Sequence, residues 1–184
     1  MKLYFASSNR KKILELSKAL KNQLISVPLD FHEIQTTELR ELVKYKIQKA
    51  HQMIQAPVIV EDTSLYFEAW NELPGPLIKW FLNNFSLEGI VQALSPFENK
   101  FANAVSCLGF TTDGKKIYYF EEKLKGKIVN PRGSRIFGWD SIFEPIGHKL
   151  TFGEMTYDKK ILISPRGKVA SKFKHFLKQQ VKQK

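Results

Sequence analysis

The sequence has little cysteine and no long apolar segment. Cys107 is the single cysteine among 184 residues, so no disulfide can form within the chain, which suits a reducing compartment. Its place in the apolar run 104–108 is typical of a core residue rather than a nucleophile. No apolar stretch approaches the roughly 20 residues of a membrane-spanning helix, and residues 1–6 form a strand-like pattern without a signal peptide. We therefore expect a cytoplasmic protein without a membrane partner.

Acidic residues are scarce relative to basic ones. The chain has 29 lysine and arginine residues against 18 aspartate and glutamate residues, a formal net charge of +11. Residues 51–100 are acidic, whereas residues 151–184 are strongly basic. This asymmetry indicates an anionic partner, either a small phosphate compound or nucleic acid. For the lysines at the end of the chain we favour a simpler interpretation, the solvated face of a helix.

Hydrophobic periodicity divides the chain into short apolar strands and amphipathic helices. Their alternation up to Val60 predicts an α/β sheet that is partly parallel, to which a later hairpin adds antiparallel strands. The length predicts one domain over residues 1–184. The predicted helices cover residues 10–20, 39–55, 77–85 and 167–180; the predicted strands cover residues 2–6, 24–29, 57–60, 101–110, 116–120 and 126–130, and residues 73–76 form an irregular corner.

Ligands of α/β sheets gather beyond the carboxyl ends of the strands, which draws attention to the segment after the first strand. Hydroxyls, a capping asparagine, helix N–H groups and cations together suit a polyphosphate. Three cations in the first helical turn are unfavourable without an anion. The alternative is an ordinary helix start with exposed lysines. The segment consists of Ser7, Ser8, Asn9, Arg10, Lys11 and Lys12.

Two adjacent carboxylates, Glu61 and Asp62, follow the third predicted strand and precede Thr63. Neighbouring side chains of a strand point to opposite sides, so we do not expect the two to share one ligand. Oxygen ligands at a strand end suit Mg²⁺, which binds one or two carboxylates together with water and substrate phosphates. A polar loop start is the common alternative for such a pair.

Two lysines lie among apolar residues. Lys46 falls on the apolar stripe of its helix, and Lys79 is flanked by apolar residues of the next predicted helix. Such a lysine either extends along the apolar surface to water or points its ammonium into a polar cavity. The segment Phe137, Gly138, Trp139 and Asp140 offers aromatic faces for a base, although a turn with core aromatics fits equally well.

The order of these motifs resembles the inosine triphosphate pyrophosphatase family, whose members remove noncanonical purine nucleotides such as ITP, dITP and XTP from the nucleotide pool. The resemblance runs from Leu3 to about Leu177. Each motif alone is weak, but this many in the family's order is very specific. The matching segments are 5–9 with Lys12 and Glu15, 60–63, 73–76, 78–81, 131–134, 137–140, 154–155 and 164–166.

The resemblance implies a hydrolase that cleaves purine nucleoside triphosphates between the α- and β-phosphates with Mg²⁺. It implies an elongated mixed sheet with flanking helices, two lobes around a central substrate cleft, and a homodimer. Asp62 would activate water, and Glu33 with Asp62 would organise Mg²⁺. Substrate contacts would come from Ser7, Ser8, Asn9, Arg10, Lys11, Lys12, Lys46, Thr63, Lys79, Phe137, Gly138, Trp139, Asp140, Lys160, Pro165 and Arg166.

Three segments depart from the family pattern. Ser8 stands where the family has glycine, and residues 159–161 read Lys-Lys-Ile where it has Glu-Lys-Asn. Pro165 replaces a histidine that the family associates with base recognition. Ser164 as N-cap and Pro165 at the first helical position remain a favoured pairing. Catalysis should survive these changes, and base selectivity is the property they affect.

Two alternatives stay open at this stage. A related pyrophosphatase fold handles modified pyrimidine nucleotides, and the charge of +11 would also suit a nucleic-acid-binding module without catalysis. Against the second alternative, Lys46 and the cations of the first helix are placed for a cleft rather than a continuous stripe. We therefore expect no stable nucleic-acid partner.

Overall fold

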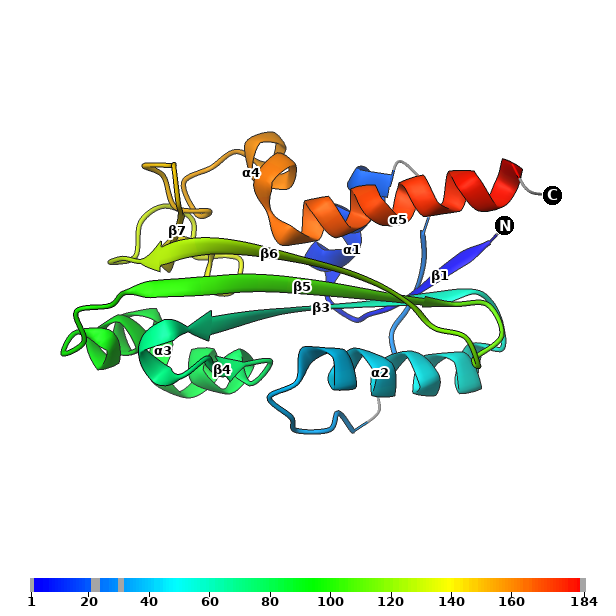
Figure 1. Ribbon diagram of the computed structural model, residues 1–184, viewed down its shortest axis with the longest axis horizontal. Helices are drawn as coiled ribbons and strands as arrows, with labels where there is room; N and C mark the ends of the chain where they lie inside the picture. Colours follow the sequence, from blue (N-terminus) through cyan, green and yellow to red (C-terminus); the bar gives the residue numbers. More distant parts are fainter. Residues whose placement is uncertain (1, 21–23, 30–31, 183–184) are drawn as a thin grey trace.

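The computed structural model describes residues 2–20, 24–29 and 32–182, in which helices and strands alternate along the first half of the chain (Figure 1). The strands are Leu3–Ala6 (β1), Leu24–Val27 (β2), Val58–Phe67 (β3), Leu73–Gly75 (β4), Phe101–Thr111 (β5), Tyr118–Ile128 (β6) and Phe143–Pro145 (β7). The helices are Arg10–Leu20 (α1), Leu39–Ile54 (α2), Ile78–Leu94 (α3), Tyr157–Ile163 (α4) and Pro165–Lys182 (α5), with 3₁₀ turns at Glu68–Trp70 and Asp140–Ile142.

In the described part of the chain, all seven strands belong to one mixed sheet. Its order is β2-β1-β3-β5-β6-β7, and β4 pairs with β3 beside this path. β1 runs parallel to β2 and β3, whereas the pairs from β3 onward are antiparallel. The predicted mixed α/β sheet is thus confirmed. Its division into two lobes and the assignment of residues 1–184 to one domain stay predictions.

Helices cover both faces of the sheet, with α1 and α5 on one face and α2 and α3 on the other (Figure 1). Leu16 of α1 and Phe173 of α5 pack in one apolar cluster, and Val43 and Ile47 of α2 pack in a second. The third cluster packs α3 against the end of β3, the start of β5 and β7. The amphipathic patterns of α1 and α2 therefore predicted their buried faces correctly.

The third strand is longer than predicted. Its polar residues indicated an end at Val60, but β3 continues to Phe67 and pairs with β5 from Val58 opposite Thr111 to Phe67 opposite Ala102. Glu61 and Asp62 consequently lie inside a strand. Such carboxylates are tolerated in a sheet where cations compensate their burial, and Lys12, Lys46 and Arg166 supply these cations here.

Other boundaries also differ from the prediction. Residues 116–120 and 126–130 belong to one continuous strand, β6, and the corner at 73–76 contains β4. The helix predicted over 77–85 continues to Leu94 across a break at Ser86, whose φ is 62°. The hydroxyl of Ser86 accepts the N–H of Gly89 at 3.2 Å and caps the second half of the helix. The short elements α4 and β7 were not predicted.

No helix within the described ranges combines the length and the apolar character that a membrane crossing requires.

Candidate active site

A cavity of about 530 Å³ opens where β1 ends and α1 begins, beside β3 and the start of α3. It also reaches the loop before the Asp140–Ile142 turn and the junction of α4 and α5. Every residue assigned to the site from the sequence lines this cavity: Ser7, Ser8, Asn9, Arg10, Lys11, Lys12, Glu33, Lys46, Asp62, Thr63, Lys79, Phe137, Gly138, Trp139, Asp140, Lys160, Pro165 and Arg166. Their roles in binding and catalysis stay predictions.

The start of α1 is organised by Asn9. Its Oδ1 accepts the N–H groups of Lys11 at 3.1 Å and Lys12 at 3.2 Å, and its own N–H donates to Ser7 Oγ at 3.2 Å. The predicted N-cap is therefore present. Ser8 and Arg10 are exposed along the cavity wall, and the Lys11 ammonium contacts the carbonyl of Ile136 across it. This end of the cavity offers hydroxyls and cations around a helix N-terminus, the chemistry that suits phosphate.

Lys46 points its ammonium into the cavity. Its Nζ lies 2.8 Å from Asp62 Oδ2 and 2.8 Å from Glu33 Oε1. Burial by itself lowers the pKa of Lys46, but the Asp62 and Glu33 carboxylates outweigh it and hold this pKa above the ordinary lysine value. The structure thus resolves the alternatives for the lysine on the apolar stripe in favour of the cavity.

Lys12 joins the two adjacent carboxylates of β3. Its Nζ lies 3.0 Å from Asp62 Oδ1 and 3.4 Å from Glu61 Oε2. One long side chain from α1 therefore pairs with both carboxylates, although they are neighbours on the strand. The expectation that Glu61 and Asp62 do not share one metal or substrate ligand stays a prediction. Burial raises the pKa of Asp62, but Lys12 and Lys46 pull it well below its usual range. Asp62 is accordingly a carboxylate at neutral pH.

Glu61 is a buried residue of the cavity wall. Its Oε1 accepts Ser106 Oγ at 2.7 Å and the hydroxyl of Thr63, and its Oε2 lies 3.2 Å from Arg166 Nε. Burial opposes the charge of this side chain, but Arg166 and Lys12 outweigh it and lower the pKa of Glu61 to about 2. Glu61 is therefore ionised at neutral pH although water does not reach it.

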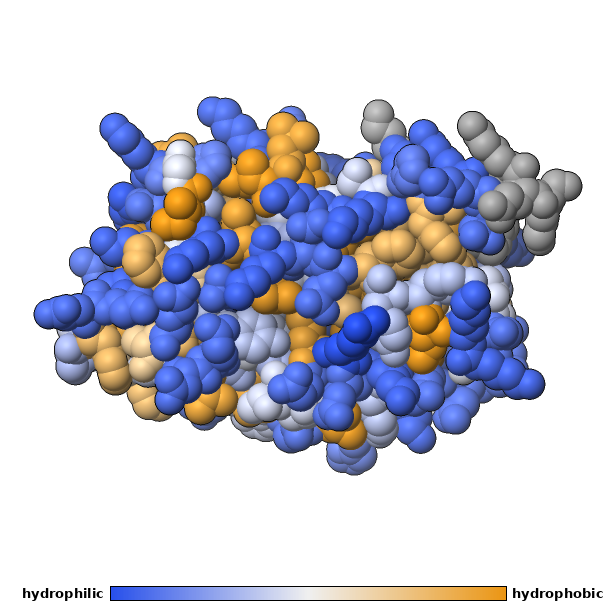
Figure 2. Space-filling view, viewed as in Figure 1, coloured by the Kyte–Doolittle hydropathy of each residue, from blue (hydrophilic) through white to orange (hydrophobic). Residues whose placement is uncertain are grey.

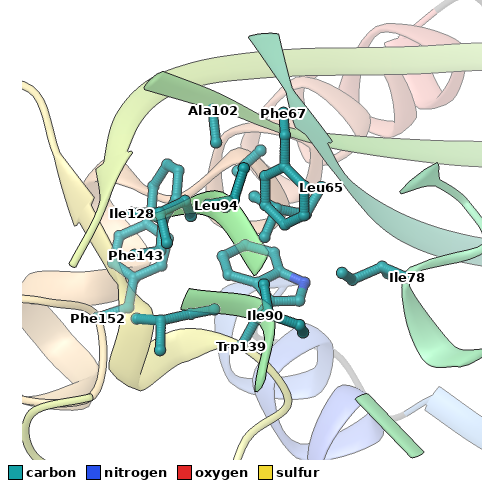
Figure 3. Close-up of a cluster of buried hydrophobic side chains, with 12 residues drawn as sticks. Leu65, Phe67, Ile78, Ile90, Leu94, Ala102, Ile128, Trp139, Phe143 and Phe152 are labelled. Atoms are coloured by element: carbon teal, nitrogen blue, oxygen red, sulfur yellow. The ribbon is translucent and has the colours of Figure 1, made fainter. Parts of the chain in front are cut away.

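The other end of the cavity is aromatic. The Phe137 ring lies 4.1 Å from Lys160 Nζ and 5.1 Å from Arg166 Cζ, within cation–π distance. Trp139 also lines the cavity, but its indole packs within the cluster that Figure 3 shows, near Phe143 and Phe152. Phe137 is consequently the more accessible face for a base, and Trp139 mainly supports the wall.

The cations at the aromatic end are held by buried carboxylates. Lys160 Nζ lies 2.5 Å from Asp140 Oδ2 and 3.1 Å from Glu15 Oε1. Arg166 donates to Glu15 Oε2 at 2.5 Å and to Thr63 Oγ1 at 3.0 Å. Burial raises the pKa of Asp140 despite the attraction of Lys160. The arrangement fixes two cations beside one aromatic ring.

The departure at Pro165 has the predicted local geometry. Pro165 is the first residue of α5, and Ser164 Oγ accepts the N–H of Gly167 at 3.2 Å as an N-cap does. The proline ring lines the cavity without a polar group.

Two residues that complete the site were not assigned to it from the sequence. Glu15 was noted only as part of the family motif, and Glu61 was considered with Asp62 as an oxygen ligand at a strand end but was not assigned to the site. Both carboxylates are buried and pair with Arg166. The one local signal was a glutamate next to the apolar face of α1, which alone does not distinguish a surface residue from a buried one.

Glu33 and Asp62 provide a donor set that fits Mg²⁺. No group of three or more histidine, cysteine, aspartate or glutamate side chains with metal-ligand spacing occurs in the described residues. Mg²⁺ does not require one, since it commonly uses one or two carboxylates and completes its shell with water and phosphate oxygens. Glu33 and Asp62 already converge on one cation, the Lys46 ammonium.

Replacing Lys46 with methionine tests its place in the cavity. We expect Lys46→Met to lower kcat/KM by about 10- to 100-fold, the range for losing a charge-assisted contact. Its melting temperature should hardly change, because methionine packs on the apolar stripe and Asp62 keeps Lys12. Kinetics and thermal melts on one preparation measure both, with exposed Lys44→Met of the same helix as control. Normal kinetics with a large loss of stability would instead show a structural lysine.

Comparison with known structures defines the fold class. The HAM1 protein from Coxiella burnetii superposes with a TM-score of 0.86 at 22% sequence identity, covering 97% of this chain and 99% of that chain. The dITP/XTP pyrophosphatase from Mycobacterium abscessus superposes with a TM-score of 0.74 at 26% identity, covering 94% and 98%. The chain therefore has the α/β fold of HAM1 proteins.

Sequence comparison then shows the family. The model of the Ham1 family matches residues 3–176. A Saccharomyces cerevisiae protein named inosine triphosphate pyrophosphatase is 41% identical over 192 residues, covering 96% of each chain. One of the same name from Schizosaccharomyces pombe is 39% identical, covering 97% of this chain and 96% of the relative. The chain belongs to the Ham1 family.

Proposed function

We propose that this chain hydrolyses noncanonical purine nucleoside triphosphates (ITP, dITP and XTP) to the monophosphate and pyrophosphate, and thereby cleanses the nucleotide pool. The observation that carries the proposal is full-length similarity, at about 40% identity, to proteins named inosine triphosphate pyrophosphatase. The cavity supports it, because one end suits phosphates and the other suits a base.

The substrate would lie along the cavity with its phosphates at the start of α1. Lys12 and Lys46 would turn from their carboxylates toward phosphate oxygens, and Lys79 would approach from the exposed first turn of α3. The base would stack on Phe137, and Arg166 would lie at its edge. This orientation would bring the α-phosphate near Asp62.

Hydrolysis would proceed by in-line attack of water on the α-phosphorus, with pyrophosphate as the leaving group. The Asp62 carboxylate would orient the water or accept its proton, and the lysines would stabilise the charge that develops on phosphate oxygens. Glu33 and Asp62 would hold Mg²⁺, which when bound neutralises charge on the triphosphate. Glu61 remains buried behind Lys12.

Two further properties belong to the same proposal. We place the enzyme in the cytoplasm, where nucleotides are used, and we infer a homodimer from the family resemblance. Exposed apolar residues such as Leu73, Phe85 and Phe101 supply surface that a second copy could cover. Light scattering at several concentrations measures the oligomeric state.

A nucleic-acid-binding module is less well supported. Lysines at the surface are partly neutralised, since Lys125 pairs with Glu68 and Lys172 with Glu122. Figure 2 shows hydrophilic side chains over much of one face, with hydrophobic ones between them. Affinity for DNA or RNA that falls steeply with salt, without pyrophosphate release, would favour this alternative.

Pyrophosphate release from a panel of nucleotides tests the proposed function. We expect release from ITP and XTP in the presence of Mg²⁺, with slower release from GTP and ATP. A modified UTP in the same panel distinguishes the purine assignment from the alternative of a pyrophosphatase for modified pyrimidine nucleotides. Turnover of the modified UTP in preference to ITP would overturn the purine assignment.

Base selectivity should respond to residue 165. A histidine at that position could hydrogen-bond to the purine edge, which proline cannot do. One neutral hydrogen bond contributes roughly 0.5–1.5 kcal/mol, so Pro165→His should widen the preference for ITP over ATP by about two- to tenfold. The values of kcat/KM for ITP, GTP and ATP measure this preference. Unchanged selectivity would mean that other residues read the base.

A further inference from the structure

Glu61 lies between the two ends of the cavity. Its Oε2 lies 3.4 Å from Lys12 Nζ, at the phosphate end, and 3.2 Å from Arg166 Nε, at the aromatic end. The backbone carbonyl of Glu61 also accepts Lys12 Nζ at 3.2 Å. One carboxylate oxygen therefore faces a cation from α1 and a cation from α5.

The carboxylate of Glu61 is fixed in place. Its side chain has no solvent exposure, and Ser106 and Thr63 both donate to Oε1. Oε2 accepts no hydrogen bond from the described residues, so its interactions with Lys12 and Arg166 are electrostatic. A buried charge that cannot turn away holds both cations strongly, because water does not screen it.

Thr63 adds a second connection from Glu61 to Arg166. The Thr63 hydroxyl donates to Glu61 and accepts Arg166 Nη2 at 3.0 Å. A displacement of Arg166 would therefore change the interactions of both carboxylate oxygens of Glu61. Lys12, in turn, reaches Asp62, the candidate catalytic carboxylate, at 3.0 Å.

We propose that Glu61 is a positioning residue that couples occupancy of the base end to the geometry of the phosphate end. A bound base that positions Arg166 correctly would also fix the positions of Glu61 and Lys12. A poorly bound base would leave the Lys12 ammonium displaced. Glu61 itself would touch neither the base nor the phosphates. The inference rests on the proposed function for the identity of the two ends.

Ligand linkage tests the coupling without turnover. The probes are inosine for the base end and pyrophosphate for the phosphate end, titrated by calorimetry separately and together. We expect saturating pyrophosphate to change the affinity for inosine by about fivefold in the wild type, the usual lower range of coupling between sites. In Glu61→Gln, which keeps the shape and removes the charge, the effect should fall below about twofold.

Lys79→Gln is the matched control, because it removes a cation of the cavity that does not contact Glu61; it should retain the coupling. Equal coupling in the wild type and Glu61→Gln, or none in the wild type, would overturn the proposal. If Glu61→Gln does not fold, Glu61→Asp keeps the charge and shortens its reach. It should weaken the coupling, and full coupling would overturn the proposal.

Kinetics provide a second readout. Glu61→Gln should lower kcat for ITP by about tenfold and narrow the ITP-to-ATP ratio of kcat/KM, whereas Lys12→Gln should slow both nucleotides in parallel. A purely structural Glu61 would lower the folded fraction and leave the ratio unchanged. Absence of pyrophosphate release by the wild type would refute the proposed function instead, and the inosine titration would still decide the coupling.

Discussion

Asp62→Asn should nearly abolish pyrophosphate release from ITP while leaving the protein folded. Asparagine keeps the size of the side chain but removes the charge that faces Lys12 and Lys46, together with the candidate proton acceptor. General-base assistance alone is commonly worth about 10²–10⁴-fold in rate. Initial rates at saturating Mg²⁺ and a melting curve of the same sample measure the two parts of this expectation.

The matched control is Asp158→Asn, an exposed aspartate in the first turn of α4. It should keep the wild-type rate, since it lies outside the cavity wall. A folded Asp62→Asn enzyme that retains more than about a tenth of the wild-type rate would remove Asp62 from the catalytic role.

Arg166→Met should cause the largest loss of stability among substitutions at the site. The guanidinium is buried between Glu15 and Glu61, whose carboxylates raise its pKa although burial opposes the charge. Removing one partner of a buried ion pair commonly costs about 3–5 kcal/mol, because the remaining charge stays buried. For a chain of this size we expect the melting temperature to fall by roughly 10 °C.

Arg135→Met removes an arginine of the same kind from an exposed pair with Glu88. Because solvent screens that pair, the melting temperature should change little. Comparison of the two melting temperatures therefore separates the effect of burial from the effect of removing the charge. Equal, small shifts in both would show that Lys12 and Lys160 compensate Glu61 and Glu15 without the arginine.

The helices could be read from local sequence more reliably than the strands. α1 begins at Arg10 and ends at Leu20 as predicted, because Asn9 caps it and its apolar residues recur with helical spacing. β3 could not be bounded in this way. Its polar segment can be buried because Lys12 and Arg166 contact it. Lys12 lies 50 residues before its partner Asp62, and Arg166 lies 103 residues after its partner Thr63, so local sequence does not show these contacts.

The site was predictable where the family resemblance implies a role for a residue, and not where the role depends on distant partners. Every residue assigned in this way lines one cavity, including Glu33, which lies outside the matching segments and has no local signal of its own. Glu15 was not assigned because its partners Lys160 and Arg166 lie 145 and 151 residues away. A buried glutamate and a solvated one look alike until those cations are placed.

Hydrolysis of ITP in water enriched with ¹⁸O tests the central claim most directly. Attack on the α-phosphorus places the water oxygen in the monophosphate, so mass spectrometry should find one ¹⁸O in IMP and none in pyrophosphate. The Asp62→Asn enzyme should yield almost no labelled product over the same time. Formation of IDP with orthophosphate, or label in pyrophosphate, would contradict the account.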